Sequence, residues 1–123
     1  MMTRTIHVFG KKEEEALRLL IRSGLHRPAA TVLVYLANIP EAISRDIERS
    51  TDLRQPEVSI AVKYLDERGW ITGRKVPSDK KGRPVRAFSL AVPFELVLET
   101  IAQEMKDEAE RKLALIRKMR EMG

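Results

Sequence analysis

The strongest constraint on this chain is its last quarter, because the segment from residue 94 to residue 122 contains neither Gly nor Pro. Apolar side chains recur there at steps of three and four residues, which is the spacing of one face of an α-helix. The segment is therefore predicted to form one uninterrupted amphipathic helix of about 45 Å, at about 1.5 Å per residue. The apolar positions are Phe94, Leu98, Ile101, Met105, Ala109, Leu113, Ile116 and Met119.

A helix of this length cannot be covered by a domain made of the remaining residues, so its apolar stripe needs another surface. A second copy of the chain is the simplest supplier of that surface. We therefore expect these apolar positions to form much of a homodimer interface, antiparallel or coiled-coil-like, which residues 11–23 are able to complete. Glu108 and Lys112 continue the series of Leu98, Ile101 and Met105, and these charges argue against a long zipper in strict heptads.

Length and composition limit the remaining options. The 123 residues fit one domain and a single long element, and 43% hydrophobic residues are enough for a core. The sequence has neither an apolar run of about 18 residues nor the apolar stretch of a signal peptide, which predicts a soluble, cytoplasmic protein without a membrane partner. The absence of Cys excludes disulfides, thiolate metal sites and thiol nucleophiles.

Ahead of the long helix, the sequence predicts four helices followed by a two-stranded hairpin. Apolar residues at helical spacing, bounded by Gly and Pro, define the helices, and β-branched and aromatic residues define the strands. The third helix is short, begins after Ser44 as its cap and buries Ile47, while residues 41–43 form an extended link. The other expected elements are helices at 11–23, 28–38 and 56–68 and strands at 70–76 and 85–90.

The net charge is concentrated in one segment. Residues 54–86 contain nine basic and four acidic side chains, and the rest of the chain contains fourteen of each. The whole net charge of +5 therefore belongs to about a quarter of the sequence. A localised basic surface is the electrostatic footprint of a protein that binds a polyanion.

The order of these elements is that of a winged helix-turn-helix. In this architecture one helix packs on the core, the next presents its N-terminal half to base edges in the major groove, and a hairpin forms the wing. The predicted fold is thus mainly α with a small β-hairpin wing, in the α+β class, with a long C-terminal dimerisation helix. The expected parts are an N-terminal arm at 1–10, a DNA-binding domain at 11–92 and the dimerisation helix at 93–123.

The polar side chains of the fourth helix suit base recognition. Gln55 fits adenine N6 and N7, Glu57 fits cytosine N4, and Lys63 fits guanine or phosphate. The wing tip has basic residues suited to phosphates or the minor groove. The full set of predicted DNA-binding residues is Ser44, Arg45, Arg54, Gln55, Pro56, Glu57, Ser59, Lys63, Arg74, Lys75, Lys80, Lys81, Arg83 and Arg86.

Residues 28–105 resemble a known class of regulators. The stretches 42–48, 55–71 and 81–90, the last of which leads from Lys-Gly-Arg-Pro into a wing strand, are similar to the winged helix-turn-helix of prokaryotic, especially archaeal, transcription regulators of TrmB-like or MarR/ArsR-like type. This resemblance implies homodimers that bind double-stranded DNA at palindromic operators. The metal-sensing cysteines of many ArsR-like proteins and the sugar-binding domain of full TrmB proteins have no counterpart, so a small-molecule effector stays unknown.

No arrangement of residues indicates catalysis. The sequence has no phosphate-binding Gly loop, no Gly-x-Ser-x-Gly and no His-Glu-x-x-His, so we expect no catalytic residues, no metal site and no cofactor. His7 and His26 lack partners at ligand spacing, and Glu13–Glu15 fit the start of a helix. Trp70 is expected to pack the hairpin onto the helices.

Three functions compatible with a winged helix remain. The chain is a sequence-specific regulator, a non-specific architectural DNA binder, or an adaptor that binds another protein. The position of the charge favours DNA, because an adaptor has no reason to place all of its net charge on the fourth helix and the wing. The sequence therefore predicts a DNA-binding transcription regulator of the cytoplasm, associated with the nucleoid, that is not an enzyme.

Overall fold

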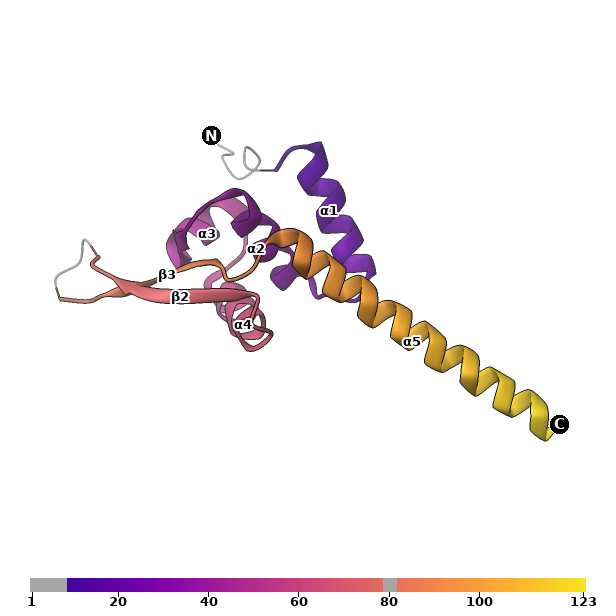
Figure 1. Cartoon of the computed structure of the whole chain (residues 1–123). Coiled ribbons are helices and arrows are strands. Elements are labelled where there is room, and N and C mark those ends of the chain that lie inside the picture. Colours follow the sequence, from indigo (N-terminus) through magenta and orange to yellow (C-terminus); the bar gives the residue numbers. More distant parts are fainter. Residues whose placement is uncertain (1–8, 79–81) are drawn as a thin grey trace. The chain divides into compact units, whose positions relative to one another are not determined.

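The structure is a computed structural model that describes residues 9–78 and 82–123. The chain divides after Pro93 into two compact units. The second unit consists of helix α5 alone. In chain order the described elements are α1 (Lys11–Arg22), α2 (Arg27–Asn38), β1 (Ala42–Ile43), α3 (Ser44–Thr51), α4 (Gln55–Glu67), β2 (Ile71–Val76), β3 (Val85–Leu90) and α5 (Phe94–Met122) (Figure 1).

The helices form where the periodicity predicts them, and α5 has the predicted bounds. Gly69 follows α4 with a φ of +77°, a conformation that L side chains rarely adopt. The prediction that Ser44 caps the third helix is wrong, because Ser44 is the first residue of α3. The Asp46 carboxylate instead accepts a hydrogen bond, at 3.4 Å, from the N–H of Ile43.

The sheet has three strands rather than the two of the predicted hairpin. Its order is β1-β3-β2, with both pairs antiparallel. Phe88 of β3 lies between Ala42 of β1 and Gly73 of β2, and all three side-chain positions share one face. The extended link predicted at 41–43 is thus an edge strand that joins the start of α3 to the wing.

The core of the first unit surrounds α2. Every residue of α2 from Ala29 to Leu36 is buried, because this helix contacts α1, α3, α4 and β3. Thr31 is the polar member of this run, and its hydroxyl donates to the Arg27 carbonyl at 2.8 Å. Among the described residues, no buried side-chain nitrogen or oxygen lacks a hydrogen-bond partner. Other core side chains are Leu20, Leu25, Ile47, Val58, Ala61, Leu65, Trp70, Ile71, Ala87 and Phe88.

Helix α5 presents a long exposed surface. Every residue from 102 to 123 is exposed, and large apolar side chains are among them. No helix of the described residues has the length and apolar character needed to cross a membrane. The exposed large apolar side chains of α5 are Leu96, Leu98, Met105, Leu113, Leu115, Ile116, Met119 and Met122.

The burial of α3 yields a test of the fold. Ile47 is 0% exposed, whereas Ile60 of α4 is 61% exposed. We expect Ile47→Ala to lower the free energy of unfolding by about 2–5 kcal/mol, because it leaves a cavity in the core. The matched change Ile60→Ala should alter it by less than about 0.5 kcal/mol. Urea unfolding at one protein concentration measures both, and equal losses would contradict the described packing of α3.

Candidate nucleic-acid interface

A tight turn sets the position of α4 relative to α3. The Thr51 hydroxyl donates to the Ile47 carbonyl at 2.5 Å, and Asp52 adopts a left-handed conformation with φ of 63°. Asp tolerates this conformation better than most residues. Leu53 then returns to the core with 9% of its surface exposed. The turn is thereby anchored at both ends, and α4 begins two residues later.

The N-terminus of α4 has its own cap. The Glu57 carboxylate accepts a hydrogen bond from the N–H of Arg54 at 2.9 Å, and Pro56 lies in the first turn of the helix. The structure thus gives Glu57 a structural partner at the start of the helix. Its contact with cytosine stays a prediction.

The two faces of α4 differ in burial. Val58, Ala61 and Leu65 are buried. At about 100° per residue, the side chains that point most directly away from them are those of residues 56, 63 and 67, and residues 59 and 60 lie about 50° to either side of that direction. Pro56, Ser59 and Lys63 were predicted from the sequence, but Ile60 was missed. The sequence could have indicated Ile60, because this residue does not belong to the series 58, 61 and 65 that packs in the core. An exposed apolar side chain at this place suits contact with a thymine methyl group.

A groove of about 460 Å³ separates α4 from the wing. Gln55, Ser59 and Val62 line it on the side of α4, and Val85, Arg86 and Phe88 line it on the side of β3. The start of α3 closes one end with Ile43, Ser44 and Arg45. The structure therefore brings together five of the predicted DNA-binding residues, namely Ser44, Arg45, Gln55, Ser59 and Arg86.

Arg86 is held in this groove by its neighbours on the sheet. Its guanidinium carbon lies 5.4 Å from the centroid of the Phe88 ring, a cation–π geometry. Gly73 leaves the space that the guanidinium fills, because a Cβ at that position would come within 2.6 Å of Arg86 Nη2. The absence of a side chain at Gly73 thus permits this placement of Arg86.

Arg74 has a different environment from Arg86. Its Nε and Nη2 donate to the two carboxylate oxygens of Glu41 at 2.7 and 2.9 Å. This hydrogen bonding lowers the pKa of Glu41 and raises the pKa of Arg74. Arg74 is registered with Ala87, so it lies on the face of the sheet opposite to Arg86. Arg74 therefore ties β2 to the residue before β1, and its contact with DNA stays a prediction.

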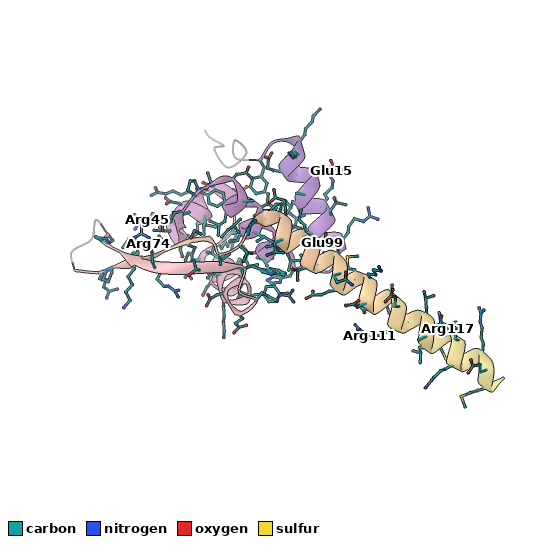
Figure 2. All side chains as sticks on the ribbon, viewed as in Figure 1. Glu15, Arg45, Arg74, Glu99, Arg111 and Arg117 are labelled. Carbon is teal, nitrogen blue, oxygen red and sulfur yellow. The ribbon has the colours of Figure 1, made fainter. Side chains whose placement is uncertain are left out.

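A second groove, of about 300 Å³, lies beside the tip end of the wing, where β2 ends and β3 begins. Arg45 lines both grooves, and Arg83 lines this one (Figure 2 labels Arg45 and Arg74). The Ser78 hydroxyl donates to the Arg83 carbonyl at 2.6 Å across the two sides of the wing tip. Arg54, Lys63 and Lys75 are exposed, whereas Lys80 and Lys81 lie outside the described residues.

The environment of Trp70 agrees with the sequence analysis. Trp70 is 6% exposed, and the Arg68 guanidinium lies 4.1 Å from its ring centroid. Trp70 therefore packs the hairpin onto the helices rather than facing a ligand. Within residues 9–78 and 82–123, no three His, Asp or Glu side chains are grouped in a way that could hold a metal ion.

A helix-turn-helix followed by a hairpin that flanks its second helix defines the winged helix-turn-helix class. Residues 23–82, which include the helix-turn-helix, match the model of the MarR family. No curated protein matches the sequence significantly.

Solved structures of other proteins share this fold. One is a possible transcriptional regulator from Methanosarcina mazei Go1, which is 18% identical with a TM-score of 0.61 over 82% of this chain and 86% of that one. NadR in complex with 4-hydroxyphenylacetate is 16% identical with a TM-score of 0.54 over 97% of this chain and 94% of its own. The MarR family regulator SP03579 is 19% identical with a TM-score of 0.51 over 85% of this chain and 65% of its own.

The contact between Gly73 and Arg86 generates a prediction about DNA. We expect Gly73→Val to displace the guanidinium and Arg86→Ala to remove it, so each should flatten the dependence of binding on salt by about one unit. The double variant should bind no more weakly than either single variant, because both changes remove the same contact. Fluorescence anisotropy on a duplex measures all three. Thr72→Val, on the opposite face of the sheet, is the control, and additive losses would show that Gly73 does not act through Arg86.

Proposed function

We propose that this protein is a sequence-specific transcriptional regulator that binds double-stranded DNA as a homodimer. The observation that carries the proposal is the groove where the exposed face of α4 meets Arg45 and Arg86. The segment that forms α4 and the wing, residues 54–86, also contains the whole net charge of +5. A protein that reads base edges beside phosphates needs both features.

In this proposal α4 lies in the major groove with its N-terminal half against the bases. Gln55 hydrogen-bonds adenine, Ile60 contacts a thymine methyl group, and Ser59 contacts a base or the backbone. Arg45 and Arg86 border α4 and bind the phosphates on either side of the groove, which fixes the register. The wing extends this contact along the DNA through Arg83, Lys80 and Lys81.

The homodimer explains how one short helix achieves sufficient specificity. Two copies related by a two-fold axis bind two half-sites of a palindromic operator, about one helical turn or 34–36 Å apart. The apolar positions predicted on α5, from Phe94 to Met119, supply the dimer interface. We place this regulator in the cytoplasm on the nucleoid and assign it no enzymatic activity.

Selection from a randomised duplex library at two salt concentrations tests this function. The expected result is salt-dependent binding with enrichment of an inverted repeat. Salt-dependent binding without enrichment would indicate an architectural DNA binder. Absence of binding would favour an adaptor that binds another protein.

The wing makes a separate prediction. We expect the triple change of Lys80, Lys81 and Arg83 to Ala to weaken binding to all DNA sequences, because each residue neutralises a phosphate. The slope of log K against log salt should become flatter by about two to three units. Anisotropy titrations over a range of salt measure this slope, and an unchanged slope would remove the wing from the interface.

Gln55 makes the prediction about specificity. We expect Gln55→Ala to cost about 1–3 kcal/mol on the selected operator, because it removes a bidentate contact with a base. Binding to random duplexes should stay nearly unchanged. Repeating the selection with this variant should show relaxed preference at one position of each half-site. An equal loss on operator and random DNA would exclude base recognition by Gln55.

A further inference from the structure

The charges of α5 are segregated along its length. Residues 94–110 contain six acidic side chains and one basic side chain, whereas residues 111–123 contain five basic and one acidic. The helix dipole favours such an arrangement only within the first and last turns. The acidic half continues to Glu110, well beyond the first turn, so the segregation needs another explanation.

A heptad series, interrupted by the charges of Glu108 and Lys112, also runs along this helix, and it differs from the apolar stripe of the sequence analysis because it passes through residues 108, 112 and 115 in place of 109, 113 and 116. Residues 98, 101, 105, 108, 112, 115, 119 and 122 follow each other at alternating steps of three and four. Six of these positions are Leu, Ile or Met, and this seam includes Leu115 and Met122, which are 57% and 89% exposed. Its two central positions are Glu108 and Lys112. Within one helix the Glu108 Oε2 lies 3.9 Å from the Lys112 Nζ, and both side chains are mostly exposed.

We propose that α5 pairs antiparallel with α5 of a second copy, about a two-fold axis at the level of residue 110. This inference rests on the homodimer of the proposed function and adds its orientation and register. In an antiparallel pair, each seam position meets the seam position equally far beyond the axis, while a flanking position packs against the nearest residue on the same flank of the partner. Glu108 then meets the partner's Lys112, Met105 meets the partner's Leu115, and Ile101 meets the partner's Met119. The acidic half of each helix lies along the basic half of the other.

A parallel pair is disfavoured by the same charges. It places Glu108 against the partner's Glu108 and Lys112 against the partner's Lys112, in the centre of the seam. Like charges opposed across an interface are unfavourable, and the two acidic halves would also lie side by side. The charges that interrupt the apolar seam thus select the antiparallel orientation, in the way that polar seam residues set register in coiled coils.

Small residues beside the seam fit the same arrangement. Ala102, Ala109 and Ile116 occupy one flank of the heptads, and Ala109 falls next to the proposed axis. On this flank Ala109 meets the partner's Ala109, and Ala102 meets the partner's Ile116. A small side chain at the axis lets the two helices approach closely, and a large one opposite Ala102 fills the space that remains.

The chain contains no Cys, so pairs of introduced cysteines can test the register directly. Met105→Cys and Leu115→Cys are prepared as separate full-length proteins, mixed and equilibrated in a glutathione redox buffer. The mixture should form a disulfide-linked heterodimer, while neither protein alone should link to itself. In the proposed register, two copies of residue 105 are about 15 Å apart along the axis, beyond the roughly 7 Å that a disulfide spans.

Gln103→Cys and Arg117→Cys form the matched control pair. Like residues 105 and 115, these two residues are equally far along the sequence from residue 110. They lie on the outer face of the helix, however, so a mixture of the two variants should form no disulfide. Self-linking of Met105→Cys would establish a parallel pair and overturn the proposal. A dimer that yields no link at 105 and 115 would also overturn it, while leaving the regulator and its DNA binding intact.

Charge variants give an independent readout by sedimentation. Glu108→Lys should weaken the dimer at least about tenfold, because it opposes like charges in two layers of the antiparallel seam. Glu108→Lys with Lys112→Glu should restore it, since the exchanged charges still meet their opposites. An unchanged dimer in the single variant would overturn the proposed register. A wild-type monomer would overturn both this register and the proposed homodimer, and the library selection separately reports whether DNA is bound.

Discussion

The complete burial of α2 is the constraint on which the first unit depends. Because eight consecutive residues, Ala29 to Leu36, are buried, no side of this helix can face water. Helices α1, α3 and α4 and strand β3 must therefore cover it from different directions. The small side chains of Ala29 and Ala30 allow close approach of the covering elements. The position of α4, and with it the candidate interface, follows from this arrangement.

Helix α4 has one face in the core and one face in the candidate interface. Val58, Ala61 and Leu65 fix it to the core, so the side chains on its outer face are held by a rigid element. The Asp52 turn and the Glu57 cap fix where the helix begins, and hence which residues occupy its first turn. A change in either would move Gln55 and Ser59 relative to Arg86.

Periodicity predicted the long elements but not the local contacts. The spacing of apolar residues was sufficient for α1, α2, α4 and α5, because each has several turns with one consistent face. Strand β1 was missed as a strand because two residues have no periodicity, and its pairing with β3 is a contact across more than forty residues of sequence. The pairing of Glu41 with Arg74 and the space at Gly73 depend on the register of the sheet, which the pattern of strands alone does not define.

The net charge of the chain is unevenly distributed between residues 54–86 and α5. Residues 54–86 have a net charge of +5, whereas residues 94–123 contain seven acidic and six basic side chains and so are nearly neutral. A nearly neutral α5 adds little to the attraction of a polyanion, which leaves the helix free to use its charges in another way. Because α5 has an acidic half and a basic half, its charges nearly cancel at long range. In the proposed antiparallel pair, the acidic half of each helix lies along the basic half of the other. In the proposed function and register, DNA binding uses residues 54–86 and pairing with a second copy uses α5, so the two proposed contacts do not compete for the same surface.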